Sequence, residues 1–495
     1  IIKTYKNVKS LRLLITSIIW FAIITYLSIT SFNVNIFKSL NASEEILFDI
    51  GTYLFSINLT ISSLSLYRSI RKDGISLRVI FWFYAFVFMG VAPIIQASAG
   101  IWIFDFDTKN FFVMSLLTLF SYIFFIFGYT VLSKKLKKKL KSGFLALENS
   151  PAYKKKFYID GNRIFLFSIL AICSSVMLVS IYGFHFSSSI ISTIFNNSYS
   201  STYQLVEYFV RPLLFFGFSF CLYAVFGGYN RPLMKLSLLL LSLSVFLIIG
   251  PLSGARSIIF FLYFGLFIII FRKALISHPM FFGSLLFFGV FGSELQSVLR
   301  NALSGGGIIF TGINYFYQGH FDGFEMLGHT VGYVKENDIT FGLQLLGAVL
   351  FWVPRAIWPD KPIGSGDFIA YEYISSNFSL LGNSNFSMPM IGEAYINFGI
   401  VGVCLIFLLV GALCGREDMR FHLINRYEAF TKGSYFSNEA SMGMWRYVMF
   451  LGMFLFLLRG DLMSGFSFLF GLYTALIFAW MILHGHPSKK KTLQK

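Results

Sequence analysis

Charged residues are scarce in this chain of 495 residues. Only 13% of the residues are Asp, Glu, Lys or Arg, about half the share found in an ordinary soluble domain. Acidic residues are the scarcer sign, with 23 against 40 basic residues. Because so few charges cannot cover the surface of a water-soluble fold of this size, the composition excludes a cytosolic enzyme.

Cysteines and several catalytic motifs are also rare or missing. The patterns G-x-x-x-x-G-K-S/T, H-E-x-x-H and G-x-S-x-G do not occur, so the sequence offers no phosphate-binding loop, zinc-protease helix or hydrolase nucleophile elbow. Two of the four cysteines, Cys404 and Cys414, would lie about 15 Å apart on one helix, too far for a disulfide. We expect neither a disulfide nor a metal–thiolate site.

Apolar residues dominate what is present. They make up 56% of the chain, Phe alone contributes 62 residues, and the mean hydropathy is +0.70. A membrane-spanning helix needs about 17 to 25 apolar residues, and twelve stretches are candidates. The sequence therefore predicts an all-α, polytopic membrane protein with about 12 transmembrane helices. They lie near 11–32, 46–66, 79–98, 110–132, 163–183, 212–228, 236–250, 256–271, 279–295, 389–415, 441–458 and 463–484.

The distribution of basic residues predicts the orientation of these helices. If the N-terminus is inside, 30 of the 40 basic residues fall in cytoplasmic segments, and the net charge of +17 reflects this bias. Basic residues are retained on the cytoplasmic side of membranes. We therefore expect both ends of the chain on the cytoplasmic side. A thirteenth apolar stretch, 339–353, would reverse everything after it if it spanned, so we expect it to lie in the outer interface or to dip into the protein.

One outward segment is much longer than the others. It covers about 95 residues, 296–390, between predicted helices nine and ten, and ordered loops of such length are usually functional. We expect it to cap a site between a first part, 1–295, with nine helices, and a last part, 391–495, with three helices and a basic cytoplasmic tail. The segment holds four basic and seven acidic residues, so it is not a general anion trap.

Four arginines lie at predicted outer boundaries of the membrane. They are Arg256, Arg300, Arg355 and Arg459. An arginine near hydrocarbon is costly unless it reaches the interface or meets an anion, and a guanidinium matches phosphate oxygens with two hydrogen bonds. The set would suit a lipid phosphate or pyrophosphate. The alternative is that each is a membrane anchor or an ion-pair partner, as Arg459 could be with Asp461.

Three residues are candidates for a general base. His320 and His329 lie in the long outward segment, and Glu393 lies in the first turn of the predicted tenth helix. Each could accept a proton or bind a sugar hydroxyl. The structural alternatives are a hydrogen-bonded histidine and a carboxylate favoured by the helix dipole.

Metal binding has weaker support in the sequence. His320 and His329 with Asp322 and Glu325 match no strong ligand spacing. The short outward stretch Asp105-Phe106-Asp107 resembles the D-x-D of metal-using sugar-nucleotide transferases, but it is only two residues. We therefore expect no metal and no other cofactor.

Three stretches together resemble a known family. They are Phe351–Gly366, which reads FWVPRAIWPDKPIGSG, then Ile391–Gly399, and Arg459-Gly460-Asp461. They look like the corresponding parts of the bacterial Wzy-type O-antigen and capsule repeat-unit polymerases. Arg355 and Gly366 fit the R-x10-G pattern of that family, whereas Arg256 and Arg300 do not keep this spacing.

The resemblance implies a glycosyltransferase of the GT-C superfamily in the bacterial inner membrane. It would polymerise undecaprenyl-diphosphate-linked repeat units at the outer leaflet without a metal, with the four arginines on the pyrophosphate. Expected partners are the lipid-linked donor and acceptor glycans, membrane lipids and a chain-length regulator, and no nucleic acid. Aromatic contacts to sugar are expected from Trp352, Trp358 and Tyr395.

Two alternatives stay open. One is an O-antigen ligase, which belongs to the same superfamily and also uses lipid-linked donors. The other is a flippase or transporter of lipid-linked oligosaccharide, which twelve helices would also suit. Transporters usually show repeated halves and sites at the membrane midplane. The polar residues here gather instead in one outward segment of the C-terminal half, which favours the polymerase.

Overall fold

The protein is helical in every regular element of its computed structural model, and no strand occurs among the described residues, as the sequence predicts. The residues that the structure describes are 18–32, 42–102, 108–134, 138, 142, 161–182, 210–226, 232–248, 263–271, 278–303, 308, 310–317, 319–374, 386–430 and 438–483.

Five of the described helices are long and apolar enough to cross a membrane. Each overlaps a predicted span, which supports the assignment to the membrane, while the total of twelve and the position of the long outward segment stay predictions. The five are Ser43–Asp73, Leu77–Ala99, Thr108–Leu132, Met390–Ile424 and Leu462–Leu483; shorter apolar helices lie at Ile18–Phe32, Asn162–Met177, Arg211–Leu222, Pro232–Phe246 and Met280–Phe291.

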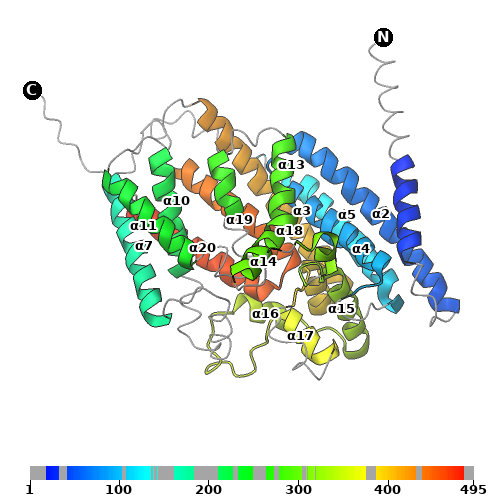
Figure 1. Cartoon of the computed structure of the whole chain (residues 1–495). Helices are drawn as coiled ribbons and strands as arrows, with labels where there is room; N and C mark the ends of the chain where they lie inside the picture. Colours follow the sequence, from blue (N-terminus) through cyan, green and yellow to red (C-terminus); the bar gives the residue numbers. More distant parts are fainter. Residues whose placement is uncertain are drawn as a thin grey trace, which may run out of the picture.

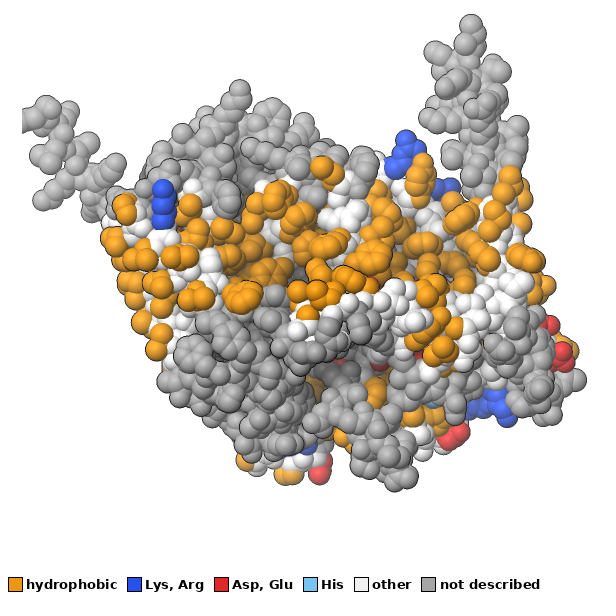
Figure 2. Space-filling view, in the orientation of Figure 1, with side chains coloured by type: hydrophobic (Ala, Val, Ile, Leu, Met, Phe, Trp, Pro, Cys, Tyr) orange, Lys and Arg blue, Asp and Glu red, His pale blue; other side chains and the backbone are white. Residues whose placement is uncertain are grey.

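The long helices lie side by side, and α15, α16 and α17 gather at one end of the bundle (Figure 1). Hydrophobic side chains form a broad band across its surface (Figure 2).

In chain order the elements are α2 (Ala42–Asp73), α3 (Leu77–Phe86), η1 (Val87–Val91), α4 (Ala92–Ala99), η2 (Thr108–Asn110), α5 (Phe111–Phe127), η3 (Gly128–Leu132), α7 (Gly161–Tyr182), α10 (Arg211–Phe226), α11 (Pro232–Ile248), α13 (His278–Leu286), η6 (Phe287–Phe291), α14 (Gly292–Leu303), η7 (Gly312–Tyr317), α15 (Gly323–Asn337), α16 (Leu343–Val349), α17 (Ser365–Ile369), η8 (Ala370–Ile374), α18 (Met390–Phe430), α19 (Asn438–Arg459) and α20 (Leu462–Leu483).

Glycines bring α18 into backbone contact with α5 and η3. A Cβ added to Gly128 would collide with the Leu408 carbonyl, and one added to Gly411 would collide with the Phe125 carbonyl. Gly411 and Gly415 are four residues apart, the small-residue spacing that lets membrane helices approach closely. This contact makes α18 a central helix of the bundle.

A buried carboxylate joins four elements at the end of the bundle away from α15–α17. Asp418 of α18 accepts hydrogen bonds from the Leu77 and Arg78 amides, at 2.8 and 3.3 Å. It also accepts from the Tyr129 and Tyr447 hydroxyls, at 2.9 and 2.6 Å. Asp418 thus caps the N-terminus of α3 from another helix, a place where a negative charge is favourable.

Helix α18 is broken near its other end. Phe398 and Gly399 have non-helical backbone angles, and Gly399 has a φ of 62°, a conformation that glycine adopts readily. The break frees carbonyls that other segments must satisfy. The Thr340 amide donates to the Ile396 carbonyl at 2.8 Å, and the Gly342 amide donates to the Asn397 carbonyl at 3.2 Å.

The uncharged stretch 339–353 thus docks on the break in α18. Within it, α16 has only seven residues, about 10 Å of helix, and turns follow up to residue 357. The Asn397 side-chain oxygen accepts from the Leu345 amide at 3.0 Å and so caps α16, whose own N-cap residue is Gly342. A helix of this length cannot cross the membrane. This agrees with the expectation that residues 339–353 do not span it.

Candidate functional site

The three stretches that carry the family resemblance meet at the α15–α17 end of the bundle. The Ser365 hydroxyl donates to Glu393 Oε2 at 2.8 Å, and the Leu462 amide donates to Glu393 Oε1 at 3.0 Å. The Gly366 amide donates to Asp461 Oδ2 at 3.3 Å. Residues nearly a hundred positions apart in the sequence therefore share one buried polar cluster.

Asp461 caps two helices in this cluster. It precedes α20 and accepts from the Ser464 amide at 3.0 Å, as an N-cap residue does. Its other oxygen accepts from the Gly366 amide in the first turn of α17. A Cβ on Gly364 would lie 2.6 Å from Asp461 Oδ2, and one on Gly366 would collide with the Phe386 carbonyl. Gly364 thus lets Asp461 lie close to α17, and Gly366 lets the Phe386 backbone do so.

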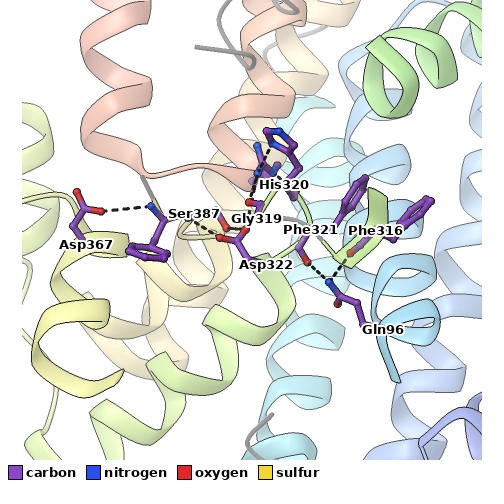
Figure 3. A network of polar contacts seen from close by, with 10 residues as sticks. Gln96, Phe316, Gly319, His320, Phe321, Asp322, Asp367 and Ser387 are labelled. Carbon is purple, nitrogen blue, oxygen red and sulfur yellow. Dashed lines mark hydrogen bonds and ion pairs between the residues drawn. The ribbon is translucent and has the colours of Figure 1, made fainter. Parts of the chain in front are cut away.

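Two further carboxylates hold the residues that lead into α18. Asp322, which precedes α15, accepts from the Ser387 amide at 3.1 Å and also from the Ser387 hydroxyl. Asp367 of α17 accepts from the Phe386 amide at 3.5 Å. Figure 3 shows both carboxylates pointing towards this short segment from different elements. The start of α18, and with it Glu393, is fixed from two directions.

Arg459 ties the end of α19 to the turn before α15. Its Nε donates to the His320 carbonyl at 2.6 Å and its Nη2 to the Gly319 carbonyl at 3.0 Å. The guanidinium approaches Asp322 at 3.9 Å and lies 5.9 Å above the Phe88 ring. The carboxylate that Arg459 meets is therefore Asp322, whereas the sequence had suggested Asp461.

Gln96 anchors the same turn from the opposite side. Its amide nitrogen donates to the Phe316 and Phe321 carbonyls, at 2.9 and 3.1 Å (Figure 3). Sequence reasoning did not single out Gln96, although an amide within the apolar range 79–98 is the kind of residue that marks a functional or structural contact in a membrane helix. Nor does the sequence pattern join Asp322, Asp367 or Asp461 to Glu393, since it offered Asp322 only in a weak metal cluster and Asp461 only as a partner of Arg459.

The predicted base candidates lie in different surroundings. Glu393 is buried with both oxygens bound. His320 is half-buried, its ring 5.6 Å from that of Tyr315 and its Nδ1 3.5 Å from Arg459 Nη2. His329 is buried in α15, 6.2 Å from the Tyr373 ring. His320 is the candidate that combines access with contact to an arginine.

The predicted arginines are only partly described. Arg355 is half-buried, and its Nη1 donates to the Pro359 carbonyl at 3.3 Å. Arg300 belongs to α14, but its side chain lies outside the described residues, as do Arg256 and the pair Asp105 and Asp107. The convergence of the arginines on one ligand stays a prediction.

The predicted aromatic contacts lie in different surroundings. Trp352 is 61% exposed, Trp358 is half-buried, and Tyr395 packs against the apolar core of the bundle. The structure therefore does not gather these three rings in a single buried cluster. Trp352 is available to a ligand or to a surrounding medium, whereas Tyr395 is mainly a packing residue.

Burial changes the proton affinity of the carboxylates outside the membrane helices. It raises the pKa of Asp367 to about 7, with the nearby Asp461 charge adding to the effect. It also raises the pKa of Asp461, and that of Asp322, where Arg459 opposes the rise. A carboxyl group with a pKa near neutrality can hold or release a proton under working conditions. Asp367 therefore joins the candidates for acid or base.

The described residues contain no group of three or more His, Cys, Asp and Glu side chains placed to hold a metal ion. The four cysteines are free thiols.

Comparison with known proteins returns no family model, no curated protein and no solved structure that matches this chain.

Proposed function

We propose that this membrane protein transfers glycosyl units between lipid-linked oligosaccharides and so polymerises repeat units at the outer leaflet. The observation that carries the proposal is the meeting of Gly366, Glu393 and Asp461 in one hydrogen-bonded cluster. These residues belong to the three stretches on which the resemblance to the Wzy-type polymerases rests. A shared site would explain why such distant stretches resemble one family together.

The chemistry of the transfer fits the residue types at this end of the bundle. A lipid pyrophosphate leaving group is anionic, so it needs positive charge more than a general acid. Arg355 would supply that charge from a half-buried position ten residues before α17 in the chain. The acceptor hydroxyl needs a base within hydrogen-bond reach, for which His320 is the most accessible of the three candidates and Asp367 is an addition.

The glycans of a strain lacking the gene distinguish this proposal from its alternatives. Single repeat units on the outside would support a polymerase. Units trapped inside would identify a flippase, and polymer that is made but not attached to lipid A would identify a ligase. Either of the last two results would overturn the proposal.

Complementation with Arg355 variants tests the mechanism. Arg355→Ala should lower the polymerisation rate by roughly 100- to 1,000-fold, as loss of one oxyanion-stabilising group does elsewhere, and Arg355→Lys should restore only part of it. Arg71→Ala is the matched control, because Arg71 is exposed at the end of α2 and donates a hydrogen bond to Tyr67, one turn earlier in the same helix. Normal polymerisation by Arg355→Ala at equal membrane abundance would contradict the assigned role.

A further inference from the structure

The outer end of the bundle carries an apolar surface on α16. Residues 339–353 contain no charged residue. Leu343, Leu346 and Val349 are about half exposed, at 48%, 48% and 52%, and they recur every three residues, which places them on one face of the helix. The opposite face, with Gln344 and Ala348, is buried. A helix bordering water presents polar residues outward, so this arrangement points to a different medium.

The same surface continues on both sides of α16. Phe341, Trp352 and Ile357 are exposed by 80%, 61% and 76%. Phe341 also has a φ of 49°, which is unfavourable for a bulky residue. A strained backbone that turns a phenylalanine outward needs a favourable contact for that side chain. Water does not provide one.

This surface is continuous with the apolar outer faces of two membrane helices. Helix α16 contacts α18 and α20, and the Phe351 ring lies 5.6 Å from that of Phe470 on α20. Just past the break at Phe398–Gly399, Val401 and Leu405 of α18 are exposed by 65% and 54%. These two residues belong to a candidate membrane span, so their surroundings are lipid. The exposed apolar residues of α16 therefore adjoin the lipid-facing surface of α18 and α20.

Charges lie where an interfacial segment needs them. Lys335 and Asp338 precede the uncharged stretch, and Arg355 and Lys361 follow it. Lys361 Nζ donates to the Phe351 and Val353 carbonyls, at 2.9 and 3.0 Å, and so satisfies backbone groups after α16. Tryptophan and basic side chains are typical of the boundary between headgroups and acyl chains.

We propose that residues 341–357 are an interfacial anchor, with the apolar side chains of α16 and its flanks embedded in the outer leaflet and the bilayer itself as their partner. Asn397 and the break in α18 fasten this anchor to the helix that carries Glu393. The anchor thereby fixes the depth of the polar cluster, and it holds Arg355 at the level of lipid phosphates. The anchor does not require that the protein be a polymerase.

Collision accessibility of spin labels tests the anchor. The four native cysteines of the full chain are replaced, and a single cysteine is introduced by Leu346→Cys, Val349→Cys or Trp352→Cys. Each cysteine is spin-labelled, and the protein is reconstituted into nanodiscs of phosphatidylethanolamine and phosphatidylglycerol. Lys335→Cys marks water, because Lys335 is exposed and polar, and Leu405→Cys marks lipid. Only variants that elute as a single species in size-exclusion chromatography are compared, and three anchor positions guard against one failing to fold.

The anchor predicts that labels at 346, 349 and 352 collide more with oxygen than with a water-soluble nickel chelate. The ratio of the oxygen collision rate to the nickel collision rate at these positions should lie between the ratio at the water reference, 335, and the ratio at the lipid reference, 405. Such an intermediate value is expected for a shallow position in the bilayer. A nickel-dominated ratio like that at 335 would place the surface in water and overturn the proposal. Low collision rates with both reagents would also overturn it, since they would show that a protein, a second copy included, covers the surface.

Discussion

At the scale of single residues, Asp461 shows how the site depends on small contacts. One carboxylate caps α20 with one oxygen and the first turn of α17 with the other. Gly364 has no side chain, which lets the carboxylate come this close, and Gly366 leaves the same room for the Phe386 carbonyl. Since Asp461 also lies beside Asp367, a change at either glycine alters both the packing and the electrostatics of the cluster.

Gly366→Ala should destabilise the cluster by about 1 to 3 kcal/mol, because the new methyl group collides with a backbone carbonyl that cannot move without shifting the start of α18. Gly283→Ala is the matched control, since nothing lies within 4 Å of a Cβ at that position in α13. The measurement is the thermal unfolding midpoint of both variants in detergent. Equal midpoints for the two variants would show that the α17 segment is looser than the structure indicates.

Asp367 should make stability depend on pH. Its folded pKa is about 7, raised from an ordinary value of 3.8. Between about 4 and about 7 the unfolded chain loses this proton while the folded protein keeps it, so this residue's contribution to stability falls as pH rises. Unfolding midpoints of the wild type and Asp367→Asn, measured from pH 5 to pH 8, should therefore converge at low pH and separate at high pH in favour of the variant. A constant difference across this range would refute the raised pKa.

At the scale of elements, the break in α18 separates two tasks of one helix. Residues 400–424 form about 37 Å of helix, which is enough to cross the hydrocarbon core. The residues before the break are therefore free to hold Glu393 and to receive α16. A straight helix would have no free carbonyls for Thr340 and Gly342.

Asn397→Ala should loosen α16 while leaving the membrane part of α18 intact. The variant loses the cap on the Leu345 amide and the hydrogen bond to the Glu393 carbonyl, and loss of an N-cap costs about 0.5 to 2 kcal/mol. Hydrogen exchange measured by mass spectrometry should be faster in peptides covering 343–349 and unchanged in peptides covering 403–412. Unchanged exchange at 343–349 would mean that packing on α20 alone holds α16.

The sequence predicted elements better than the contacts between them. Apolar runs located the long helices, because burial in lipid requires unbroken hydrophobic stretches. The sequence did not predict the break at Phe398–Gly399, since apolar residues flank this glycine just as they flank the packing glycine Gly411. The capping of α17 by Asp461 depends on three-dimensional contacts over 95 residues, for which no periodic pattern exists. Only the family resemblance joined those stretches.

At the scale of the whole molecule, the two ends of the bundle collect different residues. Leu77, Tyr129 and Asp418, which the charge bias assigns to the cytoplasmic side, meet at one end. Gln96, Asp322 and Glu393, assigned to the outside, lie at the other. This grouping agrees with the antiparallel order that the predicted topology requires of these helices.

Reporter fusions test that topology directly. A reporter placed after residue 150, 425 or 495 should indicate the cytoplasm, and one placed at 335 or 375 should indicate the outside, because basic residues are concentrated in the former segments. Alkaline phosphatase, active only outside, and green fluorescent protein, fluorescent inside, give complementary results. An outside result at 425 would place the Asp418 end outside and would remove the basis for an outward-facing site.

The Asp418 node also has a consequence for how the chain is made. Helix α3 enters the membrane early, yet the carboxylate that caps its first amides comes 341 residues later. At a synthesis rate of about 5 to 20 residues per second, roughly 17 to 70 seconds separate the two. During that interval the Ser76 hydroxyl can accept from the Val79 amide, but the Leu77 and Arg78 amides depend on water or on chaperones for their hydrogen bonds. A chain terminated before Asp418 can never complete this cap, even when every earlier helix has been inserted.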